Sequence, residues 1–164
     1  MSATKGSDYF ARTYGDLLYD LCVSLLRNSG EAQLVLRSLL KKMTIQSKNK
    51  KNAYTKYERA WILRMACEKL IHLYKQSDFQ IPPEEQIKLD SNESVSIRLK
   101  QFESYFHRLV PEDQLLFLLK EKWKIPDTEI AMALAIPEGS LKIQRLQALR
   151  TLEEWIWTNH SKSH

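Results

Sequence analysis

The sequence predicts an all-α protein built from two small helical domains that a linker joins. Apolar residues recur at helical spacing along most of the 164 residues, and no segment alternates apolar and polar residues as a strand does. Only four glycines and five prolines interrupt the chain, and the apolar share of 43% is enough for a packed core. The predicted limits are residues 8–76 for the first domain, 77–96 for the linker and 97–158 for the second domain.

The first domain is predicted to begin with an amphipathic helix over residues 8–28. Its apolar stripe consists of Phe10, Tyr14, Leu17, Leu18, Leu21, Cys22, Leu25 and Leu26. Gly30 suits the left-handed conformation that often ends a helix. A second helix over residues 31–43 is apolar on nearly all sides, so it is either enclosed or keeps one face for a partner. The polar and basic residues 41–56 are predicted to form a loop.

A third helix is predicted over residues 57–74, and it lies in a basic part of the chain. Its inner face consists of Trp61, Ile62, Met65, Ala66, Leu70, Leu73 and Tyr74. From Lys41 to Lys75, ten Lys or Arg residues stand against two Glu, a balance of +8. Positive charge follows a phosphate backbone and aromatic rings stack on unpaired bases, so this segment fits single-stranded DNA. It fits equally a solvated basic surface over core aromatics.

Residues 76–92 are polar and hold two adjacent prolines, so they are predicted to be an interdomain linker. A helix resumes over residues 93–108. Pro111 is predicted at the first position of the next helix, where its missing N–H is harmless.

The segment Asp127 to Leu152 has the pattern of a helix-turn-helix. Asp127 is predicted to cap the first helix, and residues 135–140 break it. The inner arc of the second helix is Leu141, Ala148, Leu149, Leu152 and Ile156. Residues 155–157 are predicted to pack the end of this helix, and residues 159–164 to form a frayed tail.

This order of helices resembles the extracytoplasmic-function (ECF, group IV) RNA polymerase sigma factors, over residues 8 to 156. The residues that carry the resemblance are Glu31-Ala32-Gln33, Trp61 to Ala66, Leu109 to Gln114, Glu129 to Ala131 and Ile136 to Lys142. It implies a first domain that opens the promoter −10 element while docking on core RNA polymerase, and a second that binds the −35 element. The implied partners are core polymerase, promoter DNA and an anti-sigma regulator.

The resemblance and the charge pattern together give candidate contact residues. For DNA they are Ser140, Lys142, Gln144 and Arg145 in the helix-turn-helix, and Lys50, Lys51, Trp61, Arg64, Lys69 and Lys75 in the first domain. For polymerase they are Glu31, Leu34 and Arg37. Opening a duplex requires a basic track with aromatic side chains, and reading one requires polar residues near the start of a groove-binding helix.

Some positions depart from the family pattern. Leu34 stands where an Asp is typical and Arg37 where a Gln is typical, so the expected polymerase face is apolar and basic instead of acidic. Arg145 falls within the inner arc of its helix and needs a partner there, with Glu138 and Glu154 as candidates. These departures favour an alternative, a sigma-like adaptor that binds a regulator or polymerase without recognising promoters. A dimeric helix-turn-helix repressor or activator is a third interpretation.

Enzymatic chemistry has little support in the sequence. The four histidines and two cysteines lack metal-ligand spacing, and there is no phosphate-binding glycine loop or nucleophile elbow, so no cofactor is expected. Cys22 and Cys67 lie in apolar helical stretches and are predicted to be reduced core thiols. No signal core or membrane-length apolar run stands out, so we expect no membrane insertion and a cytoplasmic location.

Overall fold

The computed structural model describes residues 7–49, 57–76 and 103–162. All regular structure in these residues is helical, and they contain no strand. The prediction of an all-α protein is therefore confirmed. No helix in the described part of the chain is both long and apolar enough to cross a membrane.

Helices α1 (Ser7–Leu26) and α2 (Ser29–Asn49) form a tight pair. The residue with left-handed backbone between them is Arg27, with φ 56, and not Gly30 as predicted. Gly30 instead lies in the first turn of α2, because Asn28 caps the start of this helix. The Asn28 Oδ1 accepts a hydrogen bond of 3.0 Å from the backbone N–H of Glu31.

The prediction of a loop from residue 41 is wrong for residues 41–49, which continue α2. Met43 is fully buried and extends the apolar stripe that includes Leu39, so the packing of α2 on α1 does not end where the charged residues begin. The Thr44 hydroxyl donates to the Leu40 carbonyl at 2.8 Å, which satisfies a polar side chain within the helix. Residues 50–56 of the predicted loop, with Lys50 and Lys51, lie outside the described residues.

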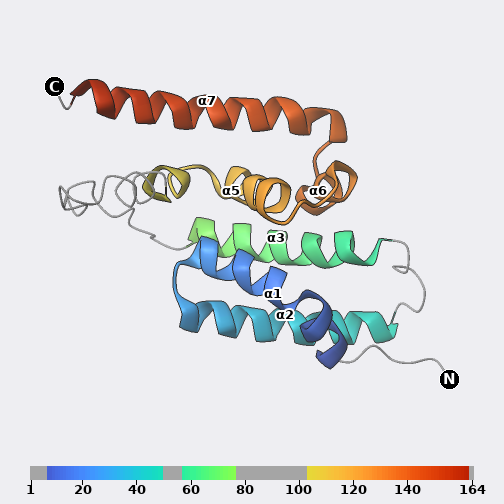
Figure 1. Ribbon diagram of the computed structural model, residues 1–164. Coiled ribbons are helices and arrows are strands. Elements are labelled where there is room, and N and C mark those ends of the chain that lie inside the picture. Colours follow the sequence, from blue (N-terminus) through green and yellow to red (C-terminus); the bar gives the residue numbers. More distant parts are fainter. Residues whose placement is uncertain (1–6, 50–56, 77–102, 163–164) are drawn as a thin grey trace.

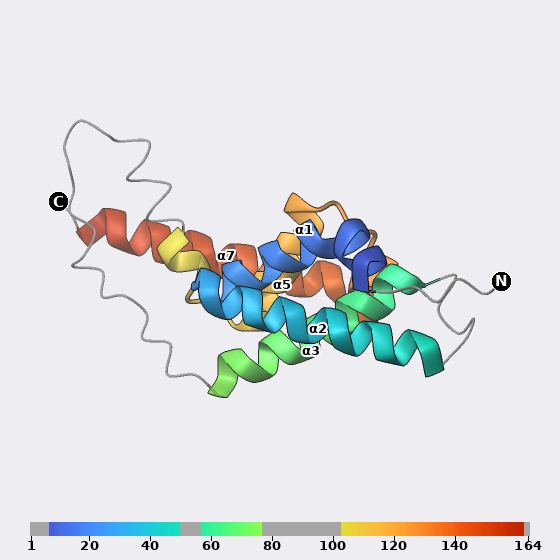
Figure 2. The same cartoon turned by 90° about the horizontal axis from the view of Figure 1, so that it is seen from below.

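Helix α3 (Glu58–Gln76) is the central element of the molecule. It lies between the α1–α2 pair on one side and the following helices on the other (Figures 1 and 2). Its buried side chains come from more than one face of the helix: Ala60, Ile62, Leu63, Ala66, Cys67 and Leu70. Cys22 of α1 and Cys67 of α3 are free thiols in this core, as predicted, and burial raises the pKa of each to about 12.

The second half of the described chain (residues 103–162) packs on the first half (α1–α3) instead of standing apart. Its elements are α5 (Pro111–Phe117), the π-helix η2 (Leu118–Lys122), α6 (Asp127–Leu134) and α7 (Glu138–Lys162). One apolar core contains Leu18 and Leu63 of the first half together with Leu115 and Ile130 of the second. We call the contact of α1 and α3 with α5, η2 and α6 the seam. The division into two domains stays a prediction.

Pro111 opens α5 as predicted. The π-helical turn that follows was not predicted, and it ends with Trp123 N–H donating to the Leu118 carbonyl at 3.0 Å. Within the helix predicted over residues 93–108, residues 103–106 are helical and a turn follows. Residues 93–102 and the linker predicted over 77–96 lie outside the described residues.

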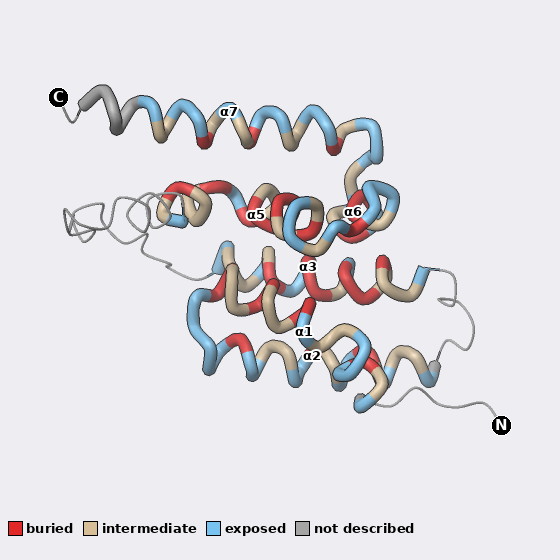
Figure 3. The backbone as a smooth tube through the Cα atoms, viewed as in Figure 1, coloured by how far each residue is buried: buried red, intermediate tan, exposed pale blue. Residues whose placement is uncertain are grey.

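The inner arc predicted for α7 is confirmed, since Leu141, Ala148 and Leu152 are buried. Leu152 and Ala148 form a small second core with Tyr105, Leu109 and Phe117, and Leu149, Trp155 and Ile156 pack against it. Two expectations at the end of α7 are wrong: the helix continues to Lys162 instead of fraying from residue 159, and Trp157 does not pack but is 74% exposed. The outward side of α7 is open to solvent along much of its length (Figure 3).

Candidate nucleic-acid interface

Helices α6 and α7 are joined by a three-residue turn, Ala135 to Pro137. Ala135 adopts a left-handed conformation with φ 56, and the N–H of Ile136 donates to the Ala131 carbonyl at 3.0 Å, which closes the end of α6. The predicted cap by Asp127 is wrong, because Pro126 precedes the helix without a side-chain cap. Asp127 instead accepts a bond of 2.6 Å from the Lys120 ammonium.

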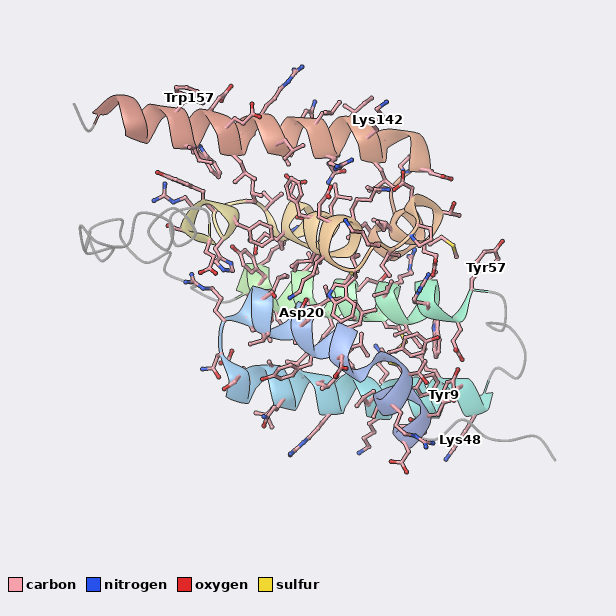
Figure 4. The ribbon with its side chains drawn as sticks, in the orientation of Figure 1. Tyr9, Asp20, Lys48, Tyr57, Lys142 and Trp157 are labelled. Atoms are coloured by element: carbon pink, nitrogen blue, oxygen red, sulfur yellow. The ribbon has the colours of Figure 1, made fainter. Side chains whose placement is uncertain are left out.

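The four residues proposed to contact DNA near the start of α7 do not share one environment. Lys142 is exposed and points away from the body of the molecule (Figure 4). Ser140 is half-buried. The Gln144 amide donates to Asp113 of α5 at 2.9 Å. Of the four, Lys142 is therefore the one most open to a duplex.

Arg145 of α7 points inward and pairs with a residue of η2 instead of facing outward. Its Nη2 lies 2.5 Å from Oε1 of Glu121 in η2, and its buried Nε has no hydrogen-bond partner in the described part of the chain. The predicted partners of Arg145, Glu138 and Glu154, are wrong. The partner is Glu121, because the π-helical turn places η2 against the inner side of α7. A DNA contact by Arg145 would require this ion pair to break.

The predicted DNA contacts did not include four further residues on the open face of α7, although helical phase already placed them on its outward side. Gln147 and Arg150 are exposed one and two turns beyond Lys142, and Ile143 and Leu146 beside them are 60% and 48% exposed. We call these five residues the α7 outer face. Polar and apolar side chains at this spacing are suited to base edges and thymine methyl groups. Their outward phase and the inward phase of Arg145 were visible in the sequence, but only packing could show that Glu121 is the partner of Arg145.

Two of the DNA candidates on α3 lie on its remaining exposed strip. Arg64 and Lys69 are exposed, and Arg64 Nε pairs with Glu68 at 3.2 Å. Trp61 is half-buried and packs edge-on against Phe10, with ring centroids 6.2 Å apart, so it belongs to the core of the first half. The strip offers cations to a phosphate backbone, whereas the Trp61 ring is engaged in core packing and is not free to stack on a base.

Other cations of α3 are held by acids of the second half. Lys75 Nζ lies 2.9 Å from Glu112 of α5. Arg59, which was not among the predicted residues, donates to both carboxylate oxygens of Glu129 in α6, at 2.8 and 2.5 Å. Part of the positive charge between Lys41 and Lys75 is therefore neutralised across the seam.

A third set of bonds closes the seam from α1. Asp20 accepts from the Trp123 indole N–H at 2.7 Å and from the Lys122 ammonium at 2.7 Å. The Asp20 side chain is 17% exposed and lies toward the second half (Figure 4). These partners are separated by about a hundred residues of sequence, so no local pattern could predict them.

The three residues predicted to contact polymerase lie on one exposed surface of α2. Glu31, Leu34 and Arg37 are all exposed, and Leu34 is 65% exposed. The same helix exposes Lys41, Lys42, Ile45 and Lys48, so its open side is basic with two aliphatic side chains. Of the two alternatives for this helix, enclosure on all sides is therefore wrong, and that a partner binds the open side stays a prediction.

Within the described residues, no group of three or more His, Cys, Asp or Glu side chains is placed to hold a metal ion. No protein-family model matches the sequence, and no curated protein matches it.

Proposed function

We propose that this protein is a transcription initiation factor of the ECF sigma type, acting in the cytoplasm. It binds core RNA polymerase and directs it to promoters through their −10 and −35 elements, under the control of an anti-sigma regulator. The observation that carries the proposal is the open outer face of α7, on a helix that follows α6 after a three-residue turn. This arrangement presents Lys142, Gln147 and Arg150 to a major groove without obstruction from the rest of the molecule.

The exposed strip of α3 supports the same proposal for the first half. Lys69 is exposed at the surface for the phosphate backbone of an opened strand, and Arg64 joins it once its contacts with Glu68 and the Met132 carbonyl are given up. Lys75 joins them once its pair with Glu112 is given up. Full use of both halves on one promoter therefore requires the seam to open at least at α5.

Transcription from a promoter library by core polymerase, with and without this chain, tests the proposal. Initiation at defined sites is the expected result, and loss of core binding at roughly 10 μM protein contradicts it. The double variant K142A/R150A should weaken duplex binding and reduce the slope of log affinity against log salt by about 1.8, since each phosphate contact contributes about 0.9. Arg12→Ala, an exposed cation on α1, is the control and should leave the slope unchanged.

A sigma-like adaptor is the second candidate, and the charge of α7 favours it. Between residues 138 and 157 three acids balance three bases, so this helix has little net attraction for phosphate. The exposed Leu34 and Ile45 on α2 give such an adaptor an apolar contact surface. In this case the chain retrieves polymerase or a regulator from a native lysate, while K142A/R150A changes neither duplex affinity nor its salt dependence.

A further inference from the structure

A cavity of about 630 Å³ lies at one end of the seam, where the last turn of α1 meets residues 103–107 and η2. Its apolar walls come from both halves: Val23 from the first, and Phe106, Phe117 and Leu118 from the second. The volume is within the range of sites that enclose small organic ligands, roughly 300–1,000 Å³, and the lining is mostly apolar, as in such sites.

Arg27 supplies a cation to this cavity that no other described residue neutralises. Two charged residues of η2 also line the cavity, and both are paired elsewhere. Lys122 pairs with Asp20, and Glu121 pairs with Arg145. Arg27 is also one of three non-glycine residues with positive φ in the described chain, at a helix end where glycine or asparagine is usual. Lys124 and Ala135 share this conformation, so the positive φ makes Arg27→Gly a substitution that the backbone accepts and does not by itself assign a role to the guanidinium.

His107 forms part of the wall of the cavity. Its Nδ1 is buried and has no hydrogen-bond partner among the described residues, so this atom faces the protein interior and not the cavity. Burial and the nearby Arg27 hold the pKa of this imidazole below its usual value. The ring therefore adds no positive charge beside Arg27 near pH 7.

We propose that this cavity binds a small monocarboxylic acid with an aromatic or branched apolar body. The carboxylate pairs with Arg27, and the body lies among Val23, Phe106 and Phe117. Glu103 at the cavity adds negative charge that disfavours phosphates and other polyanions more strongly than a monocarboxylate. The inference goes beyond the proposed function and does not depend on DNA or polymerase binding.

Because of where the cavity lies, a bound ligand is expected to stabilise the contact between the two halves. Because the walls come from both halves, an acid bound there contacts α1 and α5 at once and stabilises the closed seam. A ligand that binds only the closed form raises the melting temperature of the whole chain.

The test measures melting temperature and heat of binding for the full chain with phenylacetate and 3-methylbutanoate. Phenylacetamide, phenethylamine and inorganic phosphate serve as probes without the monocarboxylate. Both acids should raise the melting temperature, and the other probes should not. Arg27→Gly removes the guanidinium while suiting the left-handed backbone, and it should weaken acid binding about tenfold or more.

Lys124→Gly is the matched control, since Lys124 is an exposed cation with φ 53 that does not line the cavity. This variant should bind the acids as the unmodified chain does. The proposal is overturned if neither acid binds at roughly 10 mM, if Arg27→Gly binds as tightly, or if the amide, amine or phosphate acts equally.

Discussion

Arg59 of α3 and Glu129 of α6 form a two-point ion pair across the seam, with distances of 2.8 and 2.5 Å. The Glu129 side chain is 18% exposed and the Arg59 side chain 42%, so water screens the pair only in part. A planar guanidinium bonded to both oxygens of one carboxylate fixes the relative position of two helices better than a single contact does. The pair therefore sets how α6 sits on the first half.

A double-mutant cycle with Arg59→Met and Glu129→Gln should measure this coupling in chemical denaturation. We expect a coupling free energy of about 1 kcal/mol, because the pair is bidentate but partly open to solvent. The pair of Arg64 and Glu68, with side chains 50% and 64% exposed, is the control within one helix. Its cycle should give less than about 0.5 kcal/mol, and equal values for the two pairs would contradict the role given to Arg59 and Glu129.

The pair of Lys75 and Glu112 leads to a prediction about nucleic acid. Glu112→Gln removes a negative charge and frees Lys75, so affinity for single-stranded oligonucleotides should rise severalfold at low salt. Glu153→Gln makes the same change of charge on exposed α7 without freeing a cation of α3. Fluorescence anisotropy with a labelled oligonucleotide compares the two. If affinity rises by the same factor in both variants, the change in net charge explains the effect and the release of Lys75 does not contribute.

The fold could be predicted from sequence as far as local patterns reach. The helical spacing of Leu17, Leu21 and Leu25 and the inner arc of α7 both gave the correct buried faces. The boundary at residue 41 was wrong because the charged residues there surround Met43, whose burial depends on contact between helices. Propensity cannot show such a contact.

The candidate site was less predictable than the fold. Lys142 was placed correctly on an open surface by its helical phase. The positions of Arg145 and Lys75 depend on Glu121 and Glu112, which come from separate elements. The π-helical turn also has no recognisable signal in the sequence, and it determines where Glu121 lies. Charge pairs between distant elements therefore had to be read from the structure.

Asp113 should be a site of stabilising substitution. Burial raises the pKa of its carboxyl, so the folded state binds the proton more tightly than the unfolded state does. The charged form therefore costs stability above the pKa of the unfolded chain, and this cost disappears as the pH falls below it. Asp113→Asn keeps an oxygen that can accept from Gln144 and removes the charge.

We expect Asp113→Asn to raise the free energy of unfolding at pH 7 by less than about 1 kcal/mol, and to have no such effect near pH 3. Denaturation curves at both values check this. Asp16→Asn, at an exposed position of α1, should show no comparable difference between the two conditions. A stabilisation by Asp113→Asn that is larger at acid pH would have the wrong sign.

Asp20 should be the most sensitive position at the α1 side of the seam. Asp20→Ala leaves the Trp123 indole N–H without its acceptor and the Lys122 ammonium without its counter-charge, so it should destabilise the fold by roughly 1–3 kcal/mol. Asp20→Asn keeps an acceptor for the indole and loses only the ion pair, which is more exposed on its lysine side at 57%. Its cost should be smaller, at less than about 1 kcal/mol.

Repeating Asp20→Ala in a Trp123→Phe background separates the two bonds. Phenylalanine has no N–H, so the alanine substitution can then remove only the pairing with Lys122, and its cost should fall to that of Asp20→Asn. Thermal and chemical denaturation of the four variants give the comparison. If Asp20→Ala costs the same in both backgrounds, the indole bond does not hold α1 to the second half, and the cost comes from the lost pair with Lys122 instead.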